Sequence, residues 1–96
     1  MKKNLLFKKN YAVELVRAIR GAQGAAQLRT LLSDYHEHDI AEALTHLTPT
    51  ERGRVVAALD THTLADIFAY LAAAAPYLGE LPVALAAKVI SCMDSD

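Results

Sequence analysis

His36 and His38, followed directly by Asp39, are the residues whose types and spacing come nearest to a metal site. Imidazole nitrogens and a carboxylate oxygen are suitable ligands for zinc, nickel or copper. Residues two positions apart do not face each other on a helix, however, so a helix would hold the two imidazoles apart. We therefore favour a polar loop that leads into a helix, with Asp39 near the positive N-terminal end of that helix. A metal site at these residues is the minor alternative.

Other chemistry-bearing residues form no catalytic pattern. Ser33, Asp34 and His36 are too close in the chain to build a triad, since nothing orients them. Gly21 and Gly24 are the nearest glycine pair, but neither the Lys-Ser/Thr of a phosphate loop nor a preceding strand accompanies them. The single cysteine cannot form an internal disulfide and fits a reducing compartment. We predict that the chain is not an enzyme.

A short repeat organises most of the chain and must position these residues. Four similar segments begin 12 residues apart, at Leu28, Ile40, Arg52 and Leu64, and a further copy begins at Ala86. A unit this short cannot bury its own apolar face, so neighbouring units must stack into one continuous core.

Each position of the repeat has a physical meaning. The fourth, fifth and eighth positions are almost always apolar, which is the i, i+1, i+4 spacing of one helix stripe. The second position is small in most copies and allows close approach of neighbouring helices. The predicted core is Leu32, Leu44, Leu47, Val56, Leu59, Ile67, Phe68, Leu71 and Ile90. The third position is polar, and this predicts a solvent-exposed column of Thr30, Glu42, Arg54, Asp66 and Lys88.

Turn and cap signals mark where the helices begin and end. Thr48-Pro49-Thr50-Glu51 fits a capping box with proline at the first helical position, and Asp60 is suited to cap the next helix. We expect the helix at Leu64 to end near residues 72–74, a short helix to begin near Pro76, and another boundary at Leu81-Pro82. The prediction is an all-α fold, a right-handed superhelix of short helices built from repeats of about 12 residues.

Charge divides the chain into two parts. Residues 1–29 carry seven Lys or Arg and one Glu, a net +6, whereas residues 30–96 carry three Lys or Arg and ten acids, a net −7. We predict a basic N-terminal helix or arm over residues 1–24, in which Asn10 caps a helix that ends near Gly21 or Gly24, and a repeat domain over residues 25–96. The net negative charge of residues 30–96 argues against nucleic-acid binding by the repeat domain. A nucleic-acid-binding domain that uses the basic arm is a further alternative.

No segment reaches the ~20 apolar residues of a membrane span. The last four residues resemble the start of another unit, which predicts a longer protein.

The ordered motifs resemble a known family. The segment Tyr35 to Leu44, the turn Thr48 to Arg52, Leu59-Asp60 and the segment Leu64 to Phe68 are similar to the intracellular N-terminal domain of MgtE-type magnesium transporters. That family repeats short helices that end in Leu followed by Pro or Asp-Pro. The resemblance covers about residues 25–96, and it extends more distantly to the flagellar motor-switch protein FliG.

The resemblance implies a magnesium-sensing regulatory domain on the cytoplasmic side of the cell membrane. In the family, this domain docks on a CBS-pair domain when magnesium is high, and Mg²⁺ ions bridge acidic residues across the interface. Carried over by position, the bridging acid is Asp66. The implied partners are the CBS-pair and transmembrane domains of the same transporter, in a homodimer and without nucleic acid. The alternative is a helical-repeat scaffold for protein contacts, similar to a motor-switch domain, whose interactions would survive removal of magnesium.

Overall fold

The computed structural model describes residues 11–94, and every regular element in this range is a helix. The helices are α1 (Tyr11–Gly21), α2 (Ala25–Leu32), α3 (Glu37–Leu44), α4 (Pro49–Ala58), α5 (Thr61–Phe68), α6 (Ala75–Leu78) and α7 (Val83–Asp94). The predicted all-α class is confirmed. Asn10 and residues 1–9 of the basic arm lie outside the described residues.

Local capping chemistry sets where three of these helices begin. At α4, the Thr48 hydroxyl accepts from the Glu51 backbone N–H at 3.2 Å, and the Glu51 carboxylate accepts from the Thr48 N–H at 2.9 Å. Asp60 caps α5 by accepting from the Thr63 N–H at 2.7 Å, and this backbone hydrogen bond lowers the pKa of Asp60. Both predicted caps are confirmed. At α3, the imidazole Nδ1 of His36 accepts from the His38 N–H at 3.0 Å.

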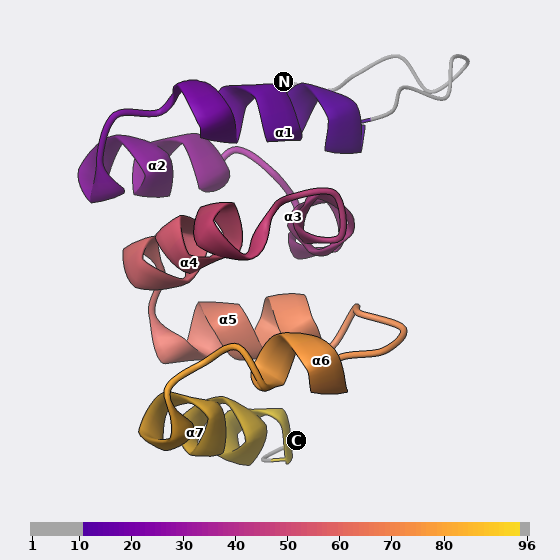
Figure 1. Ribbon diagram of the computed structural model, residues 1–96. Coiled ribbons are helices and arrows are strands. Elements are labelled where there is room, and N and C mark those ends of the chain that lie inside the picture. Colours follow the sequence, from indigo (N-terminus) through magenta and orange to yellow (C-terminus); the bar gives the residue numbers. More distant parts are fainter. Residues whose placement is uncertain (1–10, 95–96) are drawn as a thin grey trace.

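The helices stack in two columns (Figure 1). Helices α1, α3, α5 and α7 pack on one another in that order, and α2 packs on α4 beside them. Apart from the short α6, each helix therefore rests mainly on a helix two places away along the chain, which is how units of this length bury their apolar stripes. This stacking fits the predicted superhelix, and its handedness stays a prediction.

The core forms along the inside of this stack. Of the predicted core, Leu32, Leu44, Leu47, Ile67 and Phe68 are buried. Val56, Leu59 and Leu71 are half-buried and pack against that core. The prediction for Ile90 is wrong, because its side chain is 44% exposed and the adjacent Val89 is fully buried instead. Helix α7 packs on α5 alone among the helices of its column, so only one side of its apolar stripe is covered.

Helix α1 ends at Gly21 as predicted and contributes Leu15 and Ile19 to the same core. The Tyr35 hydroxyl donates to the Glu14 carboxylate at 2.6 Å, and this hydrogen bond raises the pKa of Tyr35 to about 12. The first helix of the stack is thus held by apolar packing and by a polar contact to the turn before α3. The boundary between residues 24 and 25 stays a prediction of the sequence.

The end of α5 differs from the expectation. The helix stops at Phe68 rather than near residues 72–74. The Tyr70 and Leu71 N–H groups donate to the Ile67 and Phe68 carbonyls, in the same three-residue spacing that ends α3. This ending lets the Leu71 side chain pack against the core. That packing outweighs the tendency of the following alanines to continue the helix. The predicted starts near Pro76 and after Pro82 are confirmed by α6 and α7.

Phe68→Ala tests the packing of the stack. Phe68 is among the largest fully buried side chains, so its truncation leaves a cavity between stacked helices. We expect the free energy of unfolding to fall by roughly 3–5 kcal/mol, measured by urea denaturation followed by circular dichroism. Val13→Ala, at an exposed position of α1, is the control for a helix substitution without a cavity. Near-wild-type stability of Phe68→Ala would contradict the observed core.

Glu51→Gln tests an ion pair between α1 and α4. Arg20 donates to the Glu51 carboxylate at 2.8 Å and 3.2 Å, and these hydrogen bonds lower the pKa of Glu51 from 4.5 to about 2. A depressed carboxyl pKa stabilises the fold above pH 4.5, and this stabilisation disappears as the pH falls toward 2. Glutamine keeps the capping box and removes the charge.

We expect the variant to melt below the wild type at neutral pH and the difference to vanish near pH 2. Thermal unfolding at several pH values measures this. Glu42→Gln removes an exposed acid that has no partner among the described residues and is the matched control. A constant difference between wild type and Glu51→Gln across the pH range would show that the ion pair does not contribute.

Candidate functional site

Asp66 lies on the outer side of α5. Its neighbours Ala65 and Ile67 are buried in the core, so the carboxylate between them extends into solvent. No other described residue forms a hydrogen bond or an ion pair with that carboxylate. The exposed position that the repeat predicts for Asp66 is confirmed, and the metal-binding role is a separate question.

The acids whose side chains the structure describes, Asp66 among them, divide into two groups. Four have structural partners: Glu14 accepts from Tyr35, Glu51 from Arg20, Asp60 from the Thr63 N–H, and Glu80 from Arg52. The second group has no side-chain partner among the described residues and consists of Asp34, Glu37, Asp39, Glu42 and Asp66. A carboxylate in the second group is available to an incoming cation without breaking a bond that supports the fold.

The unpartnered acids gather on α3, on the turn before it and on α5. Neither α3 nor α5 contains a Lys or an Arg, and the two helices pack directly on each other. Glu42 and Asp66 occupy the same column of the repeat in these two helices, and both are exposed. The outer side of this helix pair therefore carries a negative potential that attracts cations. Hard cations such as Mg²⁺ favour carboxylate oxygens and retain most of their water, so one or two exposed carboxylates suit them.

The candidate metal cluster at His36, His38 and Asp39 does not assemble. His36 caps α3, so the helix begins one residue later and includes His38 and Asp39 in its first turn. Both imidazole rings form T-shaped contacts with the Tyr70 ring, with centroid distances of 5.6 Å and 5.4 Å. Within residues 11–94, no group of three or more His, Cys, Asp or Glu side chains is placed to hold a metal ion.

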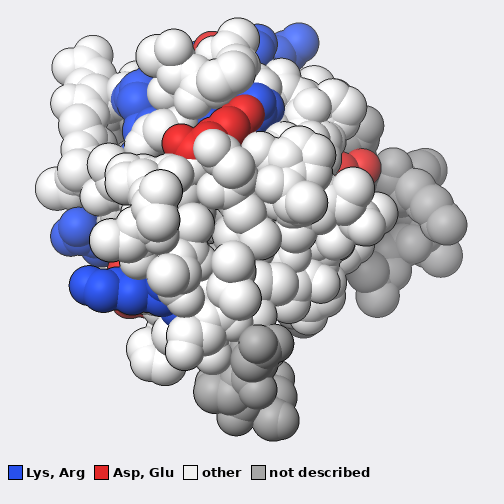
Figure 2. All heavy atoms as spheres, turned by 60° about the horizontal axis from the view of Figure 1, so that its bottom comes forward, with Lys and Arg blue, Asp and Glu red and all other residues white. Residues whose placement is uncertain are grey.

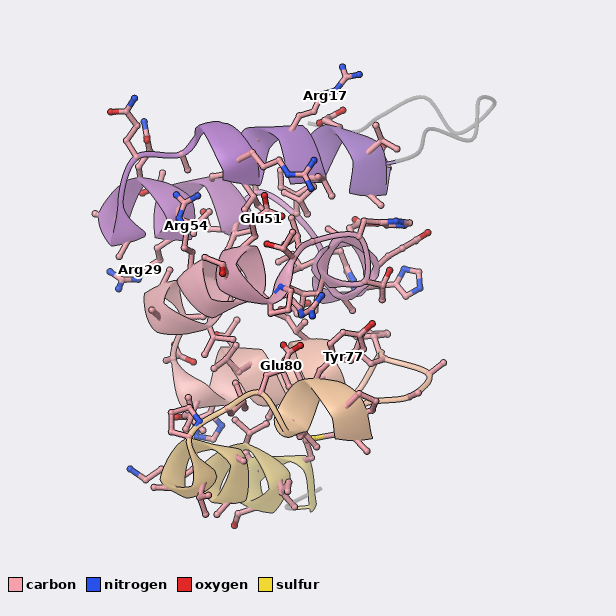
Figure 3. The ribbon with its side chains drawn as sticks, viewed as in Figure 1. Arg17, Arg29, Glu51, Arg54, Tyr77 and Glu80 are labelled. Atoms are coloured by element: carbon pink, nitrogen blue, oxygen red, sulfur yellow. The ribbon has the colours of Figure 1, made fainter. Side chains whose placement is uncertain are left out.

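The polar column has one member that is less exposed than expected. Arg54 is half-buried because its guanidinium donates to the Ile19 and Ala22 carbonyls at the end of α1. Arg29 similarly donates to the Ala58 carbonyl at 2.9 Å (Figure 3). These arginines donate to carbonyl groups at helix ends, where the regular backbone hydrogen bonds of the helix stop, so they are structural cations.

Arg52 is a residue whose importance the sequence analysis missed. Its Nε donates to Glu80 at 2.8 Å, its Nη1 donates to the Leu44 and Leu47 carbonyls, and its guanidinium lies 4.9 Å from the centre of the Tyr77 ring. Tyr77 of α6 and Glu80 of the turn after α6 extend toward α4 (Figure 3). The pair with Glu80 raises the pKa of Arg52 and lowers that of Glu80. The signal for this role is the charge at the first repeat position, where the other copies have Leu, Ile or Ala.

Beside this arginine, α6 leaves part of α4 uncovered. An apolar pocket of about 450 Å³ lies there, with Val56, Phe68 and Leu85 among its lining residues. Helix α6 has only 4 residues, which is too short to cover the length of α4. Arg52 and Glu80 are engaged with each other at this pocket, so it offers apolar surface rather than free charge.

Comparison with known proteins gives one match. The family model described as the MgtE intracellular N domain matches residues 35–96, which include α3 to α7 and the unpartnered acids Glu42 and Asp66. Searches among curated proteins and among solved structures gave no match. In residues 11–94, no helix is long and apolar enough to cross a membrane. Because the matched segment is more than half of the chain and includes α3 to α7 of the stack, the chain belongs to the family of MgtE intracellular N domains, which are the N-terminal domains of MgtE magnesium transporters.

Proposed function

We propose that this domain senses magnesium on the cytoplasmic side of the cell membrane and docks on a CBS-pair domain when the magnesium concentration is high. The observation that carries the proposal is the exposed, unpartnered carboxylate of Asp66 within a matched family segment. The family's domain is a regulatory part of a transporter rather than a catalytic domain, which agrees with a binding function.

The electrostatics of α3 and α5 support this mechanism. Their outer surface carries acids without compensating Lys or Arg, so a second acidic surface would be repelled at low magnesium. Asp66 and the partner's carboxylates would together neutralise the charge of a shared Mg²⁺, and docking would become favourable as the ion concentration rises. The ion shifts the population because it binds the docked state better than the undocked state.

Asp66 is better suited to this role than the partnered acids. Glu51 and Glu80 would have to leave their arginine partners, whereas Asp66 would give up only water. Aspartate is one methylene shorter than glutamate, so its reach toward an ion between two domains is limited. Glu42, exposed in the same column of α3, supplies a second carboxylate on the acidic side of the domain.

The proposed partners are the CBS-pair domain and the transmembrane domain of the same transporter, present as a homodimer. The pore-forming part would respond to whether this domain is docked or free. A scaffold similar to a motor-switch domain would keep its partner after magnesium is chelated, and this outcome separates the two functions.

The isolated domain should bind magnesium only weakly. Within the described residues Asp66 has no neighbouring group of ligands, and hydrated Mg²⁺ gains little from a single exposed carboxylate. Isothermal titration of the chain with magnesium chloride should give heats too small to define a stoichiometric site. A tight one-to-one site on the domain alone would contradict an interface between two domains.

Asp66→Asn in the complete transporter tests the site. Asparagine keeps the shape of the side chain and removes its charge, so the fold should be unchanged. We expect the magnesium concentration that half-saturates docking, measured by protection from proteolysis, to rise by a factor within roughly 5–150. Asp34→Asn removes another exposed, unpartnered acid, outside α5, and is the matched control. Wild-type magnesium dependence in Asp66→Asn would leave this aspartate without a sensing role.

A further inference from the structure

The cap at the start of α3 differs in kind from the caps of the next two helices. His36, Thr48 and Asp60 lie 12 residues apart, and the side chain of each accepts a hydrogen bond from a backbone N–H in the first turn of its helix. In α3 the acceptor is the imidazole Nδ1 of His36, which lies 3.0 Å from the backbone nitrogen of His38. An imidazole nitrogen accepts a hydrogen bond only while it carries no proton, so this cap exists only for the neutral ring.

The other two caps keep their acceptors throughout the neutral pH range. The hydroxyl of Thr48 does not titrate there. The backbone hydrogen bond from Thr63 lowers the pKa of Asp60, so this carboxylate stays charged. A histidine side chain in ordinary surroundings changes charge at about pH 6.5. Since His36 is exposed to solvent, protons reach its ring directly, and α3 is the one among these three helices whose cap titrates near neutral pH.

The start of α3 also depends on its cap more than the start of α4 does. In α4 the Glu51 carboxylate accepts a second hydrogen bond from the Thr48 N–H. Asp39 holds the same position in α3, but no such hydrogen bond to the His36 N–H is present in the described part of the chain. The Ile40 N–H donates to the His36 carbonyl at 3.1 Å, and this is the first backbone hydrogen bond of the helix. The imidazole is therefore the main side-chain support of the first turn.

Carboxylates gather around this cap. The pKa of Tyr35, the residue before His36, is raised to about 12 by its hydrogen bond to Glu14, and burial and the charges of Asp34 and Asp39 also contribute. The surface around α7, by contrast, carries few charged side chains (Figure 2). An imidazolium at the start of α3 would therefore lie among negative charges.

Two further rings and an acid adjoin His36. The rings of His36 and His38 both pack against Tyr70, and Glu37 follows the cap directly. Within residues 11–94, no hydrogen bond, ion pair or ring contact joins His36 to a Lys or an Arg. The remaining charged or titratable side chains on α3 and on the helices packed on it are Glu42 of α3, Tyr11, Arg17 and Arg20 of α1, and His62 and Asp66 of α5.

We infer that His36 is a proton-operated switch at the start of α3. While the ring is neutral, its Nδ1 lone pair accepts from the His38 N–H and the first turn is closed. When a proton from solvent binds Nδ1, both ring nitrogens carry hydrogens and the cap hydrogen bond is lost. The positive ring is also unfavourable at the N-terminal end of a helix, and it pairs instead with the carboxylates beside it.

The stack limits how far the switch opens the helix. Ile40 is buried in the core and is packed there whether or not the cap is present. The opening therefore involves the turn from His36 to Ile40, and the rest of α3 stays between α1 and α5. The switch requires no magnesium, and the same proton adds a positive charge to a side of the domain that is otherwise acidic.

Amide hydrogen exchange of the complete chain, followed by NMR at about pH 7.5 and about pH 5.5, tests the switch. The N–H groups of Ile40, Arg52 and Leu64 donate to the carbonyls of the three capping residues, at the starts of α3, α4 and α5. The protection factor corrects for the intrinsic effect of pH on exchange. For Ile40 it should fall by roughly 2- to 30-fold at the lower pH, which corresponds to the loss of an N-cap. For Arg52 and Leu64 it should change by less than about twofold.

Three variants separate the cap from the rest of the chain. Asparagine is a good N-cap that does not titrate, so His36→Asn should keep the fold and show equal Ile40 protection at both pH values. His36→Ala removes the cap and should show low protection at both. His38→Gln is the matched control, because it keeps the backbone donor, removes the other imidazole of α3 and should retain the wild-type pH dependence.

The ring nitrogens of His36 give a readout that does not depend on stability. At about pH 7.5, long-range proton–nitrogen NMR spectra should show Nδ1 without a proton and Nε2 with one. Ile40 protection that is independent of pH in the wild type would overturn the inference. So would a pH dependence that persists in His36→Asn or one that His38→Gln abolishes, because the proton would then act at another group.

Discussion

The shortness of the helices is the constraint on which the structure depends. Helices α2, α3 and α5 have 8 residues each, and helices of this length are not stable alone in water. Stacked neighbours cover the apolar stripes of all three, and side-chain caps satisfy free N–H groups at the first turns of α3 and α5. The caps at Thr48 and Asp60 and the arginines that bind carbonyl groups thus stabilise the short helices together with the buried Leu and Ile residues.

This construction separates residues that hold the fold from residues that are available for binding. Every helix except α6 packs buried residues into the core, and most Arg residues and four of the described acids are used at helix ends or between helices. What is left is the outer column of the repeat, where Glu42 and Asp66 lie on α3 and α5. A family that regulates transport through such a domain can change these outer residues without disturbing the stack.

The sequence predicted best what is determined within one repeat unit. The capping box at Thr48, the cap at Asp60, the burial of Phe68 and the exposure of Asp66 each depend on a few neighbouring residues and on helix geometry. The predictions from sequence failed where contacts between distant parts of the chain determine the structure. Ile90 is exposed because α7 has one stacked neighbour, and α5 ends early because Leu71 packs into the core. The side-chain partners of Arg52 are distant in the chain, since Glu80 lies 28 residues away and Tyr77 lies 25 residues away, so no local pattern could identify them.

The contacts of Arg52 also bear on how the domain opens. In a simple stack, each unit interacts only with its neighbours, so the ends fray independently of the middle. Arg52 joins the carbonyl groups at the end of α3 to Glu80 and Tyr77 near α6, and so it links parts of the chain that plain stacking would leave separate. The amide hydrogens of α3, α4 and α6 would then exchange with solvent as one cooperative unit, while α7 beyond this link could open at a lower free-energy cost.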